Sequence, residues 1–300
     1  MDGDEWLVGH FERYRPHLRA VAYRMLGSLT EADDAVQDTW VRLSRSRAED
    51  VENLGGWLTT IVARVCLNML RSRNHRREEP LAVHMPDPVV SAEGELQPEE
   101  QALLADSVGL ALLVILDTLT PDERLAFVLH DMFELPFREI ARVLGRTPAA
   151  AKQLASRARH RVKGAEIPAD PDLARQREVV DAFFAAARQG DFEALVAVLH
   201  PDVLLRADTG ARHAGASLRI HGSAAVAKLV IRGMRRWLAV AVTELRPVLV
   251  NGSAGVVVTM DGQPNTVISF TVAERKIAGI DAIVDPERAR KIAAFASTAR

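Results

Sequence analysis

The sequence contains one cysteine, and aromatic residues make up only 5% of its 300 residues. The single thiol, Cys66, cannot form an internal disulfide or a multi-cysteine metal site. It lies in an apolar helical pattern, so we interpret it as a core residue. No signal-peptide core opens the chain, and no apolar run is long enough to span a membrane. These absences predict a protein of the reducing cytoplasm, without a metal or other cofactor.

Composition indicates a globular protein, with 48% hydrophobic and 26% charged residues. The length predicts two or three domains. The net charge of -2 conceals a strong local asymmetry, because basic helical stretches alternate with an acidic one.

The most informative stretch lies between Leu119 and Lys163 and predicts a helix-turn-helix. Thr120 and Glu123 have the spacing of a capping box, which predicts a helix to about residue 131. A second short helix is expected over residues 137–144 and ends at Gly145. A third helix starts within three residues, as the short turn of this motif requires.

The third helix has an apolar side and a basic side. Five residues at helical spacing form the expected buried stripe: Ala151, Leu154, Ala155, Ala158 and Val162. The basic side is typical of a helix in the major groove of DNA, and no acidic residue interrupts it. We predict Lys152, Gln153 and Ser156 as base readers, and Arg157 and Arg159 as phosphate anchors. The alternative is an ordinary two-helix corner with a solvated basic face.

Residues 6–77 are expected to form successive helices. A second helix starts with a capping-box pattern at Thr30, and its outer face carries Asp34, Gln37 and Asp38, with Trp40 further along. A third helix carries Trp57, Arg64, Asn68 and Arg71 along one side, and aromatic, polar and cationic side chains of this kind can hold single-stranded DNA. Alternatively, Trp57 is a core anchor and the arginines are a solvated helix end.

Three blocks in this order resemble the extracytoplasmic-function sigma factors: EADDAVQDTWVRL, GGWLTTIVARVCLNMLRSRNHRRE and the helix-turn-helix. The resemblance implies a protein that binds core RNA polymerase and directs transcription from specific promoters. By position, it assigns Asp34, Gln37, Asp38 and Trp40 to the polymerase contact. It assigns Arg64, Asn68 and Arg71 to the helix that melts the minus-ten element, and residues 152–159 to the helix that reads the minus-thirty-five element on duplex DNA. The expected modules are all-α and cover residues 1–77 and 107–165.

Residues 78–106 contain four prolines and many acids but no lysine or arginine, which predicts a linker. This acidic segment could thread a basic channel of the polymerase or mask the basic helices. Alternatively, its charge simply keeps the chain soluble. The segment LAVHMPDPVV lies where sigma factors with a fused C-terminal domain carry a tryptophan-containing proline motif, but the tryptophan is missing here.

Residues 172–300 predict an α+β domain in which helices precede a curved antiparallel sheet. Strands are expected near residues 203–207, 239–242, 248–250, 255–260, 266–272 and 277–283. A helix is expected over residues 223–236, and another after residue 286. The order resembles the SnoaL-like cone of polyketide cyclases and ketosteroid isomerases, and QGDFEALVAVLHPDV is its most typical piece. The resemblance to sigma factors with a fused cone implies that the cone regulates the chain from within, through motifs that correspond here to Asp208, Arg212, Asp285 and Glu287.

An enzymatic cone is the alternative, giving a DNA-binding protein fused to a cyclase or isomerase. Asp208 and Asp281 are its candidate acids, but the domain contains no tyrosine to act as an oxyanion donor. We therefore expect a regulatory or ligand-sensing module that contacts the sigma modules or the linker, with a small hydrophobic molecule as a possible ligand.

Overall fold

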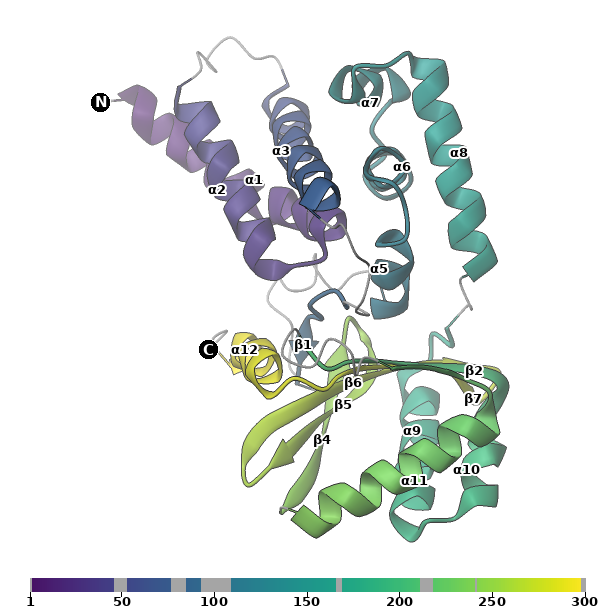
Figure 1. Ribbon diagram of the computed structural model, residues 1–300. Coiled ribbons are helices and arrows are strands. Elements are labelled where there is room, and N and C mark those ends of the chain that lie inside the picture. The colour runs from purple at the N-terminus through teal and green to yellow at the C-terminus, as the bar shows by residue number, and fades with distance from the viewer. Residues whose placement is uncertain are drawn as a thin grey trace. The chain divides into compact units, whose positions relative to one another are not determined.

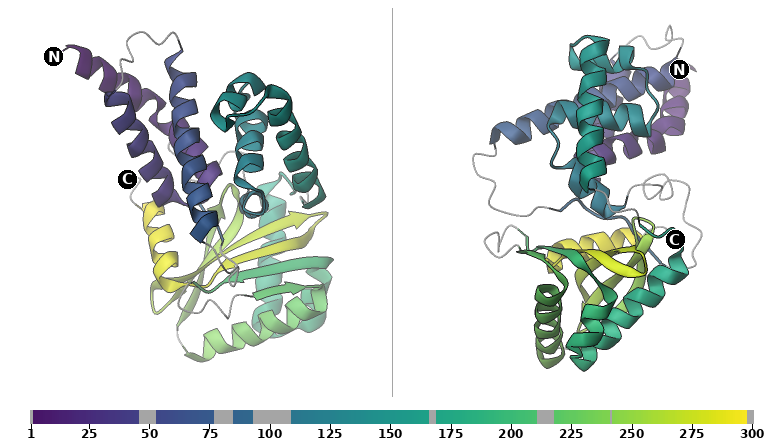
Figure 2. Two further views of the ribbon diagram at one scale, coloured as in Figure 1. Left: turned by 45° about the horizontal axis from the view of Figure 1, so that its top comes forward. Right: turned by 90° about the vertical axis from the view of Figure 1, so that its right-hand side faces the viewer.

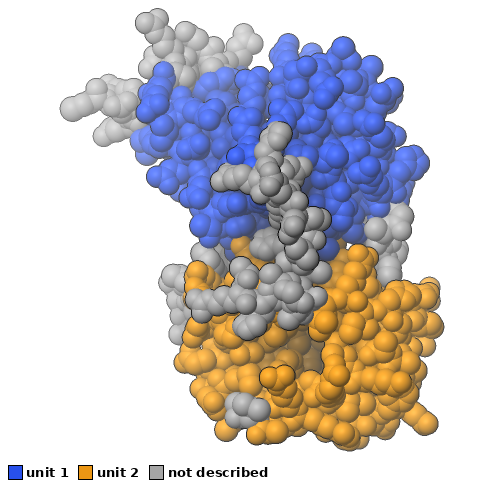
Figure 3. Space-filling view, in the orientation of Figure 1, with its two compact units in different colours: residues 1–80, 102–104, 112–166 blue, residues 81–101, 105–111, 167–300 orange. Residues whose placement is uncertain are grey.

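The protein was analysed as a computed structural model, which describes residues 2–45, 53–76, 85–92, 109–165, 169–210, 218–240 and 242–297. It divides into a helical unit and a sheet-containing unit, coloured separately in Figure 3. The helical unit comprises residues 1–80, 102–104 and 112–166, and the second unit takes the remainder. No helix within the described ranges is both long enough and apolar enough to cross a bilayer.

The first module of the helical unit is a bundle of three helices, α1 (Asp2–Leu26), α2 (Leu29–Ser44) and α3 (Leu54–Arg76). The predicted cap at Thr30 is wrong, because Ser28 caps α2 and its hydroxyl accepts a hydrogen bond from the Glu31 amide. Cys66 is fully buried in α3, as expected of a core residue. Burial raises the pKa of its thiol well above the usual range.

The second module contains α5 (Leu110–Leu116), α6 (Pro121–Phe127), the π-helical turn η2 (Val128–Met132), α7 (Phe137–Leu144) and α8 (Pro148–Ala165). Both hydrogen bonds of the capping box at Thr120 are present. The helix expected to run to residue 131 changes to a π turn at Val128. Gly145 ends α7 with a φ of 65°, the left-handed conformation predicted for it.

A buried arginine joins the two helical modules. Arg124 of α6 is 2% exposed, and its Nε donates to the backbone oxygen of Arg24 in α1 at 3.2 Å. Its Nη1 donates to Asp117 at 2.8 Å. Burial lowers the pKa of Arg124, and the nearby Asp117 carboxylate opposes that shift. The two modules therefore share a hydrogen-bonded cation as well as apolar contacts.

The second unit is built on a seven-stranded sheet in the order β1-β4-β5-β6-β7-β2-β3. The strands are β1 (Val90–Ser91), β2 (Leu199–Asp208), β3 (Leu218–His221), β4 (Thr243–Val250), β5 (Ser253–Met260), β6 (Gln263–Ala273) and β7 (Lys276–Ile283). All neighbours pair antiparallel except β2 and β7, which are parallel.

Helices cover both faces of this sheet (Figures 1 and 2). On one face lie α9 (Leu173–Gln189), α10 (Phe192–Val198) and α11 (Ser223–Val240), and on the other lies α12 (Pro286–Ser297). The core under the first three helices is apolar, and Phe183, Phe184 and Phe270 make edge contacts in it. The expected α+β fold is therefore confirmed.

The sheet differs from the sequence prediction, which did not include β3, in two further details. The strand expected over residues 239–242 is wrong, because α11 continues to Val240 and β4 begins only at Thr243. Strand β1 comes from the segment expected to be a linker, and pairs with Leu249 and Val250 on the edge of β4. The end of α11 was misjudged because a short apolar run fits either a helix or a strand. Strand β1 could not be predicted because its pairing depends on which edge of the sheet remains open.

One glycine of the sheet provides a test of this packing. A Cβ at Gly255 would lie 2.8 Å from the backbone oxygen of Ile268 and 2.4 Å from Val250 Cγ2. Gly255→Ala should therefore destabilise the second unit by about 1–3 kcal/mol, since the strand must shift. Gly233→Ala, in the open on α11, should instead stabilise it by about 0.5–1 kcal/mol. Calorimetric unfolding of both variants checks this, and equal shifts would contradict the predicted contact.

Candidate nucleic-acid interface

The predicted reading helix, α8, presents polar side chains on one side and packs with the other. All five residues of the predicted apolar stripe are buried. Lys152 and Gln153 are exposed near the start of the helix, and Ser156 is half-buried. Neither Lys152 nor Gln153 forms a side-chain hydrogen bond or ion pair with a described residue. Both remain available to an external partner.

The arginines of α8 already have acidic partners within the same module. Arg159 Nε lies 2.6 Å from a carboxylate oxygen of Asp131. Arg161 Nη1 lies 2.8 Å from Glu123, and Arg157 Nε lies 3.6 Å from the same side chain. These ion pairs fasten α8 to α6 and η2. The sequence of α8 did not reveal them, because the acids belong to other elements.

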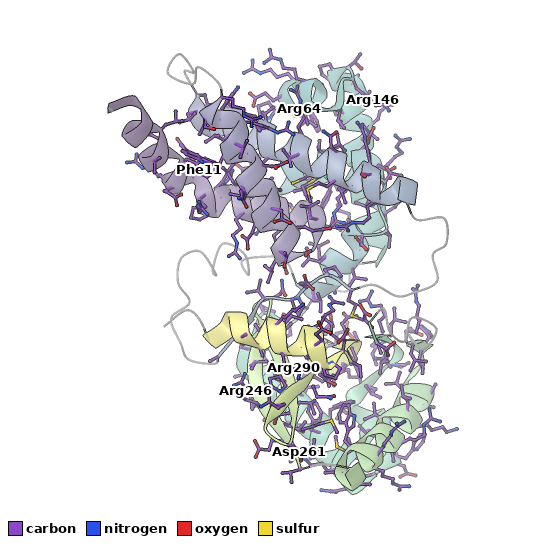
Figure 4. The ribbon with its side chains drawn as sticks, turned by 60° about the vertical axis from the view of Figure 1, so that its left-hand side comes forward. Phe11, Arg64, Arg146, Arg246, Asp261 and Arg290 are labelled. Carbon is purple, nitrogen blue, oxygen red and sulfur yellow. The ribbon has the colours of Figure 1, made fainter. Side chains whose placement is uncertain are left out.

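The predicted melting helix, α3, directs two arginines at the helix-turn-helix module. Arg64 Nη2 donates to the backbone oxygen of Arg142 in α7 at 3.2 Å. Arg71 Nη2 donates to Asp122 of α6 at 2.8 Å, and Arg146 donates to the other oxygen of that carboxylate at 3.2 Å. Figure 4 labels Arg64 and Arg146 within the helical unit. Asp122 thus holds a cation from each module.

The remaining candidates on α3 are less constrained. Asn68 is exposed, and Trp57 is half-buried, which is compatible with either interpretation of that residue. Of the basic end of this helix, the structure describes Arg73, which pairs with Glu31 and donates to the Leu26 carbonyl. In this arrangement DNA phosphates would compete with protein groups for Arg64 and Arg71.

A histidine and an aromatic ring complete the contact between modules. His17 of α1 packs edge-on against Phe133, with ring centroids 5.2 Å apart, and Arg24 lies over the same ring. Burial, followed by the charge of Arg24, lowers the pKa of His17. The neutral imidazole lies 3.2 Å from the Thr59 hydroxyl, within hydrogen-bonding distance. Acid pH therefore disfavours this packing, because protonation places a second cation beside Arg24.

The candidate polymerase-binding residues form a face of α2. Asp34, Gln37 and Asp38 are exposed, and none is paired with a described residue. Val41 follows on the same side with 37% of its surface exposed. Trp40 instead is half-buried and packs on Phe11 with a centroid distance of 5.0 Å. An acidic face with an exposed apolar residue is suited to docking a partner protein.

Candidate residues of the sheet unit converge on the segment 85–91. Asp208 is 3% exposed, and its carboxylate accepts hydrogen bonds from the backbone amides of Met85 and Gly210, each at 2.9 Å. Arg288 of α12 donates to Asp208 at 2.7 Å, to the Met85 oxygen at 2.8 Å and to Asp87 at 2.7 Å. The guanidinium thus bridges the sheet and the segment.

A second contact with this segment lies at the hairpin between β4 and β5. The side-chain oxygen of Asn251 accepts from the Val89 amide at 3.0 Å, and the Asn251 amide donates to the Val89 oxygen at 2.8 Å. Asn251 has a φ of 49°, as a tight Asn-Gly turn requires. We call Asp208, Asn251 and Arg288 the linker clasp. It covers both ends of residues 85–89 and continues into strand β1.

The other regulatory candidates, Asp285, Glu287 and Arg212, are not part of the linker clasp. Asp285 caps α12 by accepting from the amides of Glu287 and Arg288. Its carboxylate closely approaches Gly210, where a Cβ would lie 2.1 Å from Asp285 Oδ2, and the φ of Gly210 is 75°. Glu287 is exposed and pairs with Lys291, whereas Arg212 lies outside the described residues. The sequence analysis did not predict Asn251, Arg288 or Asp87 as contact residues. The Asn-Gly turn could have indicated Asn251.

Comparison with known proteins matches both helical modules to one group of families. The family model for Sigma-70 region 2 matches residues 10–76, and that for Sigma-70, region 4 matches residues 109–162. The two matches fall on α1–α3 and on α5–α8.

Two similar proteins come from Mycobacterium tuberculosis. The ECF RNA polymerase sigma factor SigJ is 37% identical over 290 residues, which are 94% of this chain and 92% of that protein. Its crystal structure superposes with a TM-score of 0.74 at 33% identity, covering 94% of this chain and 97% of that one. The probable ECF RNA polymerase sigma factor SigI is 38% identical over 63% of this chain and 66% of its own length.

The ion pair between the modules predicts a gain of single-strand binding. Asp122→Asn removes the anion that engages Arg71 and Arg146, while it keeps the size of the side chain. Because exposed ion pairs contribute about 0.2–1 kcal/mol each, affinity for a mixed-sequence single-stranded oligonucleotide should rise about two- to fivefold. Fluorescence anisotropy measures this change.

Asp131→Asn is the matched control, because it frees Arg159 inside the same module without touching α3. It should leave single-strand affinity unchanged and raise duplex affinity instead. If both variants raised single-strand affinity equally, the effect would be one of net charge, and the Asp122 contact would not restrain α3.

Proposed function

Because the chain belongs to the extracytoplasmic-function sigma factors of bacterial RNA polymerase, we propose that its exposed polar faces contact polymerase and promoter at defined residues. In this proposal α2 docks on core polymerase through Asp34, Gln37 and Asp38. Lys152 and Gln153 of α8 read the minus-thirty-five element on duplex DNA. The protein works in the cytoplasm, where polymerase meets the chromosome.

The melting step is assigned to α3. Asn68 is already exposed, while Arg64 and Arg71 are engaged by the helix-turn-helix module. Promoter opening then requires the two modules to separate, so that both guanidiniums exchange protein oxygens for those of the displaced strand. Base capture by Trp57 would stabilise the opened strand, since this half-buried side chain is accessible without unfolding.

We further propose that the C-terminal domain restrains the chain by holding its linker. This proposal rests on the linker clasp. In it, Asp208 accepts a hydrogen bond from the Met85 amide, and Arg288 donates one to the Met85 carbonyl oxygen. A segment bound in this way cannot at the same time thread a channel of the polymerase. Asp87, in the described part of the linker, forms an ion pair with Arg288 of α12 at 2.7 Å.

No observation favours the enzymatic alternative. Val203, Leu205 and Ala207 of β2 face the apolar core under α9–α11, so Asp208 points to the opposite face of the sheet. Asp281 lies between two core residues of β7 and points the same way, where Arg206 binds it at 2.6 and 2.9 Å. Burial raises the pKa of Asp281, and Arg206 opposes that shift. Neither acid faces an interior in which a hydrophobic substrate could bind.

Transcription from genomic fragments tests the assignment of the reading helix. Core polymerase with this chain should start transcripts at a defined set of promoters. Gln153→Ala should change the preferred minus-thirty-five sequence, because a base contact discriminates by about 1–3 kcal/mol. Lys152→Ala tests the other proposed reader, because Lys152 has no ion-pair partner among the described residues. Substitutions of Arg157 or Arg159 are less suitable, because their ion pairs also hold α8 in place. Equal losses at every sequence for Gln153→Ala would show that it is not a reader.

The linker clasp has its own test. Arg288→Ala removes the guanidinium that binds Asp208, Asp87 and the Met85 oxygen. This loss should release residues 85–91 and raise transcription from the same promoters several-fold. Arg290→Ala is the control, because this neighbour on α12 is exposed and makes no ion pair with a described residue. Limited proteolysis near residue 87 reports release directly. Unchanged or reduced transcription after confirmed release would contradict restraint by the clasp.

A further inference from the structure

Helix α11 of the C-terminal domain carries four cations on its outer side. Lys228, Arg232, Arg235 and Arg236 follow one another at helical spacing, all four are exposed, and α11 contains no acidic residue. We call these four residues the cationic stripe. None of them forms an ion pair with a described carboxylate. This differs from the helical unit, where Arg71, Arg146, Arg157, Arg159 and Arg161 are all paired.

The stripe borders a hollow in the surface. Lys228, Ile231, Arg232 and Arg235 line a volume of 390 Å³. The turn between α9 and α10 approaches it at Gly190, where a Cβ would lie 3.3 Å from Arg235 Nη2. Three of the four lining side chains are cationic, so the hollow is suited to an anion.

The chemistry of the helix argues against a membrane as its partner. An interfacial helix leaves its apolar side free to enter the lipid. In α11 that side is already used, because Val226, Ala227 and Met234 are buried in the core against the sheet. The outer side carries the cationic stripe, and Leu238 is exposed near the end of the helix. Lys228 and Arg235 lie about 10 Å apart along the axis at 1.5 Å per residue, which matches about three base pairs of duplex rise.

The connection along the chain limits how far the C-terminal domain can lie from α8. Helix α8 ends at Ala165 and α9 begins at Leu173, so seven residues join them. Such a connection spans at most about 25 Å. If α8 lies in the major groove, the C-terminal domain must stay beside the duplex.

We propose that the cationic stripe is a second, sequence-independent DNA contact, which binds the phosphate backbone beside the site read by α8. The proposal rests on the proposed function of α8, because the reading helix brings the domain to the duplex. The stripe adds affinity and not specificity, since phosphates carry no base information.

The salt dependence of duplex binding tests the proposal in the full-length protein. The stripe variant combines Lys228→Gln, Arg232→Gln, Arg235→Gln and Arg236→Gln. The slope of log K against log salt concentration should fall in magnitude by about 0.9 for each phosphate that the variant cannot bind, so by about two to four in total. The control variant removes four charges elsewhere in the domain: Arg275→Gln, Lys276→Gln, Arg290→Gln and Lys291→Gln. Its slope should equal that of the wild type.

Several outcomes would overturn the proposal. Equal slopes for the stripe variant and the wild type would exclude the contact, and an equal decrease of the slope in both variants would reduce the effect to net charge. Stripe-dependent binding to phosphatidylglycerol vesicles with an unchanged DNA slope would assign the surface to lipid instead. If the wild type bound no duplex at any salt concentration, the stripe proposal would fail, while the sigma function would still be judged by transcription with core polymerase.

Discussion

The arrangement of the helical unit depends on a guanidinium that its two modules share. Arg124 is anchored to Asp117 in its own module, and it reaches the backbone of α1 through Arg24. A buried cation is costly unless it is paired, and Arg124 keeps one buried nitrogen, Nη2, without a hydrogen-bond partner in the described structure. Its position is therefore sensitive to the fit between modules. That fit also sets α3 against α6 and α7, and thereby brings Arg64 and Arg71 to the second module.

The arginines of α3 and α8 that we propose to bind DNA already have protein partners in this structure. On α8 they bind Asp131 and Glu123, and on α3 Arg71 binds Asp122. A phosphate offers the same kind of charge-assisted hydrogen bond as a carboxylate. In the proposed function, binding a promoter would exchange one anion for another, so its net free energy would be smaller than the number of new contacts suggests. In the proposed function this exchange would couple DNA binding to the separation of the two modules, because Asp122 belongs to one and Arg71 to the other.

The C-terminal domain uses the two faces of its sheet for different purposes. The face under α9, α10 and α11 is filled by apolar side chains and gives the domain its stability. The opposite face carries Asp208, which together with Arg288 binds a segment more than a hundred residues earlier in the chain. Backbone hydrogen bonds dominate that contact, so it depends less on the identity of the linker side chains. The segment is thus held although it contains no tryptophan.

The sequence by itself determined the features that depend on neighbouring residues. The capping box at Thr120, the left-handed Gly145 and the buried stripe of α8 are each decided within one or two helical turns, and all three are present. The α+β nature of the C-terminal domain also followed from local patterns. Even there, the end of α11 and the start of β4 were misjudged, because short apolar runs fit either state.

Only the tertiary structure decided which charges meet. No local pattern pairs Arg71 with Asp122, or joins Met85, Asp208 and Arg288, since these residues are separated by 51, 80 or more than a hundred positions. Propensity and periodicity report the surroundings of a residue along the chain. The partner of an exposed guanidinium is set instead by how helices and strands pack, and that packing also places no acid from the described part of the chain beside the four cations of α11.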